Sequence, residues 1–192
     1  MFEGRYVNKI AITNGPAARR GLYVGTIRSN ASAQINDTLA LRHVWNNYNR
    51  VPRAMQAALE TANTWTYSTA TIRQANANAA NQLDFVLGLN EDAVSAEATG
   101  ACANSAGTIV VATLIGLDST SAMASGCVNG VGVTPAVNVT FSMTARWRGF
   151  AGAGRHYLAW LEYSAATPTT TWCGDNNGPT ISQSGIQGEV LA

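Results

Sequence analysis

Hydrophobic and polar residues alternate at every second position in several parts of the chain. Residues 137–147 give the clearest case, and the runs at 65–73, 81–90 and 108–118 are rich in β-branched, aromatic and other apolar residues. A period of two predicts strands with one buried face, and this composition favours strand over helix. In the clearest strand, the side chains expected to point inward are Val137, Val139, Phe141, Met143, Ala145 and Trp147.

Turn-forming residues separate these runs. Asn14-Gly15-Pro16 and the glycine- and asparagine-rich stretches at 125–130, 149–154 and 174–178 supply the backbone conformations that tight turns need. One short segment, residues 53–60 after Pro52, is compatible with two turns of helix. The pattern predicts an all-β protein, an antiparallel β-sandwich or jelly roll over residues 22–192, preceded by a polar N-terminal arm at residues 1–21.

The stretch from Gly152 to Gly178 contains a histidine, a carboxylate and a thiol, the side chains of a nucleophilic site. His156 and Glu162 have the same parity in one predicted central strand, and six positions of strand separate them by roughly 20 Å. We therefore expect His156 to bond a neighbour at the start of the strand and Glu162 to pair with an arginine. Cys173 follows a predicted strand rather than opening a helix, so nothing nearby would lower its pKa. The sequence predicts no catalytic residues and no enzyme.

Charge is sparse and uneven. Charged residues make up 12% of the 192 residues and the net charge is +1, yet residues 1–73 hold nine Lys or Arg against three Asp or Glu. Residues 84–118 hold five acids and no base. Because complementary potentials help to fix register in assemblies, we interpret this as contact between copies or with another protein. The bases are spaced singly, which is not typical of a nucleic-acid-binding surface, and no apolar run is long enough to span a membrane.

The three cysteines, Cys102, Cys127 and Cys173, have no C-x-x-C spacing. That excludes the common zinc and thioredoxin patterns, and no phosphate-loop or dinucleotide motif occurs, so we expect neither metal nor cofactor. Cys102 and Cys127 fall in apparent loops, and an odd number of thiols leaves at least one for an interchain disulfide. The alternative is that all three are reduced and partly buried.

Several segments in order resemble a known β-rich domain. They are RHVWNNYNRVPR (42–53), TWTYSTATIRQAN (64–76), NQLDFV (81–86), GLDSTSA (116–122), GRHYLAWLEYS (154–164), TTTWCGDNNG (170–178) and QSGIQGEV (183–190). Together they are similar to domains of tailed-bacteriophage virion fibres and decorations. The resemblance implies a non-enzymatic virion structural protein, a capsid-decoration, neck or short-fibre component. It would be a homotrimer, assembled with other virion proteins in the host cytoplasm.

An alternative reading of the resemblance is a receptor-binding tail-fibre or tip module that recognises a host-surface glycan or protein. Trp65, Tyr67, Trp160 and Trp172 would suit a carbohydrate-binding face, although their parity favours core packing. In either case residues 1–21 would anchor the domain, because aromatic and arginine side chains dominate interface energetics. The expected anchor contacts are Phe2, Arg5, Tyr6, Arg19 and Arg20.

Overall fold

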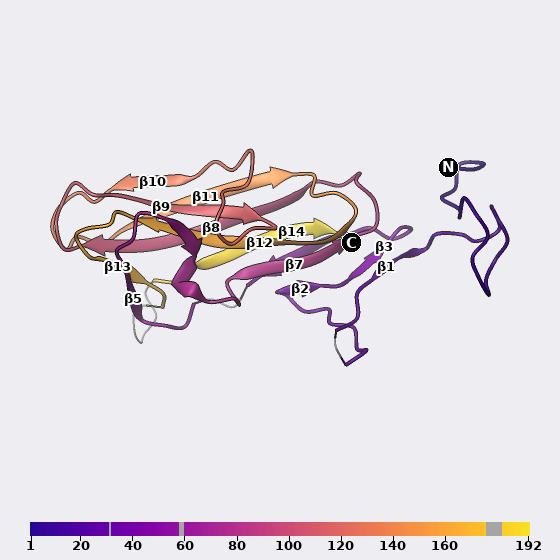
Figure 1. Cartoon of the computed structure of the whole chain (residues 1–192), viewed down its shortest axis with the longest axis horizontal. Helices are drawn as coiled ribbons and strands as arrows, with labels where there is room; N and C mark the ends of the chain where they lie inside the picture. The colour runs from indigo at the N-terminus through magenta and orange to yellow at the C-terminus, as the bar shows by residue number, and fades with distance from the viewer. Residues whose placement is uncertain (31, 58–59, 176–181) are drawn as a thin grey trace.

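The computed structural model describes residues 1–30, 32–57, 60–175 and 182–192. The chain forms an elongated antiparallel β-sandwich, and its N-terminal residues extend beyond one end of the sandwich (Figure 1). The predicted all-β sandwich is confirmed. Most successive strands from β7 to β13 alternate between the two sheets, so the sheets are joined by many crossings of the core.

The first sheet has six strands and is centred on β12 (Gly154–Ser164). β12 pairs along one edge with β9 (Val110–Leu117), and along the other with β7 (Gln82–Leu87) and then β6 (Ile72–Gln74). The outer strands are β10 (Gly130–Val133) beside β9 and the short parallel strand β2 (Leu41–Arg42) beside β7.

The second sheet is built around β8 (Val94–Asn104) and also has six strands. β8 pairs along one edge with β11 (Phe141–Gly149), and along the other with β14 (Gly185–Leu191) and then β13 (Thr170–Cys173). β4 (Pro52–Gln56) extends the sheet beyond β14, and β5 (Thr64–Tyr67) extends it beyond β13. A separate pair, β1 (Gly25–Ile27) and β3 (Val44–Asn46), and a 3-10 turn, η1 (Ala75–Ala77), complete the elements.

Tryptophans fill the space between the sheets. Trp160 and Trp172 are fully buried, and Trp65 packs edge-on against Trp160 and stacks on Trp172 at a ring separation of 6.4 Å. Their indole N–H groups have partners: Trp160 donates to Thr113 Oγ1 over 2.7 Å, and Trp172 donates to Ser164. Hydrogen-bonded indoles can be buried without an unpaired donor. The core interpretation of these aromatics is therefore confirmed, and they form no exposed glycan-binding face.

Two local predictions are wrong. The described residues of the segment 53–60 form no helix, because β4 occupies Pro52–Gln56 and pairs with β14, which buries Met55. Tertiary pairing outweighs the helix propensity of a short segment. Val137 and Val139 are exposed, because the left-handed Asn138 lies in a turn and the strand starts only at Phe141. From Met143 onward, the predicted inward side chains are buried.

The N-terminal segment has its own small hydrogen-bonded structure, centred on Asn8. The Asn8 side chain donates to three backbone carbonyls between residues 10 and 17, and its oxygen accepts from the N–H of Gly21. Tyr23 N donates to Tyr6 O, which closes the loop back toward the sandwich. The arm predicted over residues 1–21 is therefore a folded loop, and the chain runs from it into β1.

Candidate functional site

A groove lies on the outer face of the second sheet. Its volume is about 670 Å³. The floor is made by β11, β8, β14 and β4, which lie in that order across the sheet. Because side chains alternate along each strand, a strand that sends apolar residues into the core presents polar residues to this face.

Strand register arranges these outward side chains in rows. One row runs Arg146, Glu97, Gln187, Gln56 across the four strands. Arg146 Nε donates to Glu97 Oε2 over 2.7 Å. The neighbouring row runs Arg148, Ser95, Glu189, Ala54. The groove therefore has a floor of guanidinium, carboxylate and amide groups, with a small alanine at one corner.

Two apolar side chains form the rims. Val128 forms an isolated bridge to Arg146 along the free edge of β11, and Leu39 lies beside β4, where its carbonyl accepts from Gln56 N. Both side chains are more than half exposed. A second hollow of about 250 Å³ continues the groove and shares Gln56, Glu97 and Gln187 with it. The groove is open and extended rather than enclosed.

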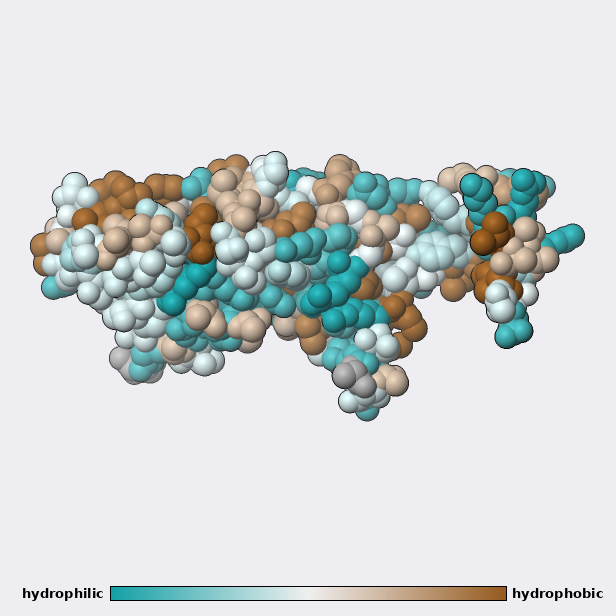
Figure 2. All heavy atoms as spheres, viewed as in Figure 1, coloured by the Kyte–Doolittle hydropathy of each residue, from teal (hydrophilic) through white to brown (hydrophobic). Residues whose placement is uncertain are grey.

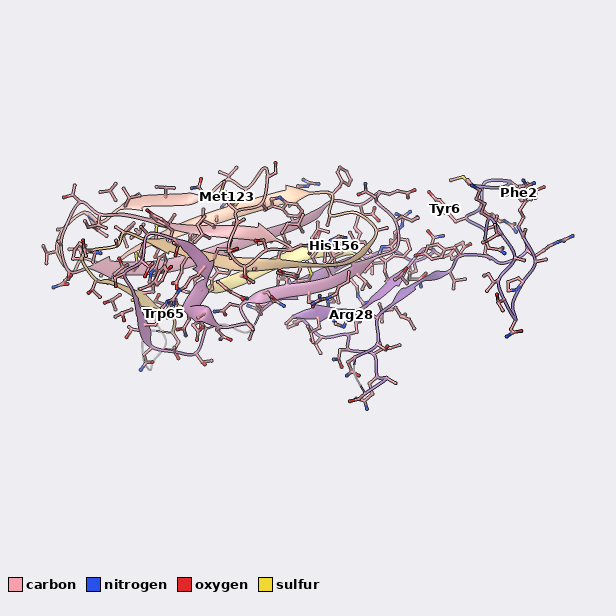
Figure 3. The ribbon with its side chains drawn as sticks, viewed as in Figure 1. Phe2, Tyr6, Arg28, Trp65, Met123 and His156 are labelled. Carbon is pink, nitrogen blue, oxygen red and sulfur yellow. The ribbon has the colours of Figure 1, made fainter. Side chains whose placement is uncertain are left out.

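A buried carboxylate, Asp84 on β7, links the N-terminal region to the sandwich. Arg155 donates to it through Nε and Nη2, and Arg28 through Nη1 at 3.2 Å. His43 Nε2 lies 3.0 Å from Asp84 Oδ1. Burial alone would raise the pKa of Asp84, but the hydrogen bonds from Arg155 and His43 and the nearby arginine charges lower it below the ordinary value. Figure 3 shows Arg28 on the segment that leads from the arm to the sheet.

A second buried carboxylate, Glu162 on β12, lies inside the sandwich. Trp65 Nε1 and Arg73 Nε each donate to it over 2.7 Å, and Asn76 N donates over 3.2 Å. The pairing of Glu162 with an arginine was predicted and is confirmed. Complete burial raises the pKa of Glu162, and these three donors offset that rise only in part.

The acids between residues 84 and 118 have partners within the same chain. Asp84 pairs with Arg28 and Arg155, and Glu91 and Asp92 both pair with Arg50. Glu97 pairs with Arg146 and Asp118 with His156. Three of these five acids thus meet bases from the N-terminal half, so the uneven charge joins parts of one chain and gives no reason to invoke a second copy.

The structure separates the candidate nucleophilic residues. His156 lies near the start of the long strand β12, as predicted, and its Nδ1 lies 2.8 Å from Asp118 Oδ2. Cys173 ends β13 in the other sheet, opposite Thr64 and Ala101. No contact joins Cys173 to either histidine among the described residues, and no cluster of three metal-ligating side chains occurs there. None of the described helices is long and apolar enough to cross a membrane.

The three cysteines have no disulfide partner within the chain. Cys102 was expected in a loop, but it lies in the middle of the second sheet, where β8 continues through Asn104, and it is fully buried. Burial raises the pKa of all three thiols, and that of Cys102 to about 12. Cys173 is also buried, so only Cys127, half-buried in the loop before β10, stays a candidate for the predicted interchain disulfide.

The predicted anchor residues gather in the N-terminal loop. The Arg19 guanidinium lies 5.2 Å from the Phe2 ring centroid. Phe2, Arg19 and Arg20 line a hollow of about 500 Å³, and Arg5 is exposed beside them. Tyr6 is different, because its hydroxyl donates to Glu91 and so ties the loop to the sandwich. In Figure 3, Phe2 lies farther from the sandwich than Tyr6 does.

Comparisons with known proteins do not identify a family. No family model matches the chain, and no curated protein matches it. An aminopeptidase from the marine sediment archaeon Thaumarchaeota archaeon is similar with a TM-score of 0.35 and 6% identity, over 97% of this chain and 40% of that one. A Paenibacillus sp. cycloisomaltooligosaccharide glucanotransferase complexed with cycloisomaltoheptaose gives a TM-score of 0.27 and 14% identity, over 70% of this chain and 18% of that one. The chain spans less than half the length of either enzyme, and no activity is transferred from likenesses this weak.

Proposed function

We propose that this chain is a non-enzymatic structural subunit of a bacteriophage virion, which assembles through exposed apolar surfaces and is held on the particle by its N-terminal loop. The ordered set of segments that resembles phage fibre and decoration domains supports a bacteriophage origin of the protein. The distribution of exposed apolar side chains supports the role. The subunit would be assembled in the host cytoplasm with other virion proteins.

The observation that carries the proposal is a surface of exposed valines that lies outside the buried core of the sandwich. Six valines on and around β10 are between 44% and 71% exposed. Residues 119–145, which contribute five of them, include no charged residue. Hydrophobic atoms gather over the end of the molecule where β10 lies (Figure 2). Large exposed apolar patches mark interaction sites. We define these residues as the valine surface: Val110, Val128, Val131, Val133, Val137 and Val139.

The N-terminal loop offers a second apolar surface, at the opposite end of the molecule in Figure 1. Its large side chains Ile10, Ile12 and Leu22 are each exposed by close to half or more. The exposed Arg5, Arg19 and Arg20 belong to the same segment, and arginine and aromatic groups are the usual anchors of interfaces. We assign the valine surface to contacts between copies in a homotrimer, and the loop to contacts with another virion protein.

Two variants test the two assignments separately. Deletion of residues 1–21 should leave the sandwich folded and oligomeric but absent from purified phage particles. The double substitution Val131→Lys with Val133→Lys places charge on the valine surface and should convert the oligomer to a monomer in sedimentation velocity. Thr66→Lys, on an exposed strand position elsewhere, is the matched control and should change neither result.

Wild-type protein that sediments as a monomer at low salt would contradict the contact between copies. Normal incorporation of the deletion variant into particles would contradict the anchor. If an interchain disulfide forms in the mature particle, Cys127→Ser should abolish a multimer band on a non-reducing gel, whereas Cys102→Ser should leave it. A monomer band from alkylated wild-type particles would rule out that disulfide.

A further inference from the structure

The groove on the second sheet carries an inference that does not depend on the proposed structural role. Its floor is made of side chains and not of free backbone edges. β8 is paired along both edges, and β14 lies between β8 and β4. Outside β4, the backbone is occupied as well, since Ala54 O accepts two bonds from Arg42. Between β8 and β4 an added peptide strand would find no open ladder, so recognition on this part of the floor comes from side chains.

The row Arg146, Glu97, Gln187, Gln56 alternates donors and acceptors. Each amide side chain offers two N–H donors and an acceptor oxygen, and each guanidinium offers a planar fork of donors. Neighbouring members of the row stand about 4.8 Å apart, the spacing of paired strands. Such a row can hold a ligand with closely spaced hydroxyl groups that both donate and accept. The rims Leu39 and Val128 supply apolar contact on either side.

One cation in the groove lacks a counter-charge. Glu97 is neutralised by Arg146, whereas Arg148, exposed on the same face, has no ion pair with another described residue. Glu189 lies in the row of Arg148 but two strands away, which places it roughly 10 Å across the sheet. An anionic group on the ligand would therefore complete the site at Arg148.

We propose that the groove binds an acidic oligosaccharide, whose hydroxyls are held by the row from Arg146 to Gln56 and whose carboxylate pairs with Arg148. An elongated, open groove that continues into a second hollow suits several linked sugar units rather than one small molecule. Small ligands instead prefer enclosed pockets that cover most of their surface.

The test is a titration of ¹⁵N-labelled full-length protein, followed by amide chemical shifts. Hexagalacturonate is the acidic probe, maltohexaose the neutral control, and hexaglutamate the control for an acidic peptide. Hexagalacturonate should shift amides of β8, β11 and β14 and the side-chain amides of Gln56 and Gln187. The spectra also report whether each variant is folded.

Arg148→Ala and Gln187→Ala should each weaken binding of hexagalacturonate by about tenfold or more, the loss expected for a charge-assisted or multiple hydrogen bond. Ser142→Ala, on the same exposed face of β11 but outside the groove, should leave affinity within about twofold. The proposal is overturned by the absence of shifts at millimolar probe, or by shifts outside the groove. Equal binding of maltohexaose, or tighter binding of hexaglutamate at the same residues, also overturns it.

Discussion

Asp84 and Glu162 are both buried carboxylates that accept bonds from arginine, yet their acidities are displaced in opposite directions. Asp84 lies on β7 and receives two arginines and a histidine, which lower its pKa in spite of burial. Glu162 lies in the interior with one arginine, an indole and a backbone N–H, and burial raises its pKa. Burial of a carboxyl group sets the free-energy cost of ionising it, and the number of cationic partners decides whether that cost is offset.

The two sites also hold different parts of the molecule together. Arg28 and His43 come from the region around β1 and β3, so the Asp84 site attaches the N-terminal region to the first sheet. Glu162 instead joins β12 to Trp65 of the other sheet and to the turn at η1. A substitution at Glu162 should therefore destabilise the sandwich, and a substitution at Asp84 should weaken the attachment of the N-terminal region to the first sheet.

The largest effect is expected for Glu162→Ala. It leaves the Trp65 and Asn76 N–H groups without an acceptor inside the core and opens a cavity, which should lower the free energy of unfolding by about 4 kcal/mol. Urea unfolding monitored by tryptophan fluorescence measures this. The matched control is Glu97→Ala, which removes an exposed carboxylate paired with Arg146 and should cost less than about 1 kcal/mol. Equal losses in the two variants would contradict the assigned roles.

Asp84→Ala should have the next largest effect, about 3 kcal/mol, because it leaves His43 and two arginines without their shared acceptor. The loss is smaller than at Glu162 because Arg28 and Arg155 reach solvent and can be rehydrated. Hydrogen exchange should show faster exchange across β1 and β3 with less change in β12. Uniform acceleration through both sheets would argue against a local attachment site.

The pH dependence of stability should separate the two carboxylates by sign. Because the pKa of Glu162 is raised in the folded state, the folded protein keeps a proton that the unfolded chain loses, and stability declines as pH rises above about 4.3. Because the pKa of Asp84 is lowered, its contribution is present above about 3.9 and is lost as pH falls toward the folded value.

Urea unfolding between roughly pH 3 and pH 8 tests both signs. The difference in unfolding free energy between wild type and Glu162→Gln should shrink as pH rises above about 4.3. The difference between wild type and Asp84→Asn should shrink as pH falls below about 3.9. Parallel curves for wild type and either variant would show that the folded and unfolded pKa values of that residue are the same.

The smallest effect is expected for Arg28→Ala, about 1 kcal/mol or less, because this side chain is partly exposed and Arg155 still neutralises Asp84. This variant tests where the effect occurs. Hydrogen exchange should become faster in β1 and β3, while the global free energy of unfolding stays nearly unchanged. Arg53→Ala, which breaks a comparably exposed pair with Asp37, is the control and should leave that exchange unaltered.

The two carboxylates also show how far sequence reasoning reaches. The parity of residues 154–164 was enough to place Glu162 in a central strand and to predict an arginine partner for it, because the information lies in one strand. Asp84 was not singled out, since its partners come from positions 28, 43 and 155 and only the folded chain brings them together. The groove was missed for the same reason. Each of its rows contains one residue from each of four strands, and the sequence alone does not reveal how those strands are aligned.

Failed predictions have a common physical origin in short segments. Met55 and Cys102 are held by pairing with distant strands, and local composition at 53–60 and 100–107 gave no sign of that pairing. Val137 and Val139 continued an alternation that a single left-handed residue, Asn138, interrupts. Long strands with a strict period, such as β12, were predicted well because many residues carry the same signal.

The position of β14 in the second sheet sets the order in which the sandwich can be completed. This strand, Gly185–Leu191, lies between β8 and β4 and pairs with both of them. Until synthesis reaches these residues, β8 has half of one edge unpaired and Met55 on β4 has no sheet to pack into. The core therefore cannot close before these residues have been synthesised and have emerged from the ribosome. Folding must wait for a contact that spans more than 130 positions, as between Gln187 and Gln56, the kind of long-range pairing that makes β-proteins fold slowly.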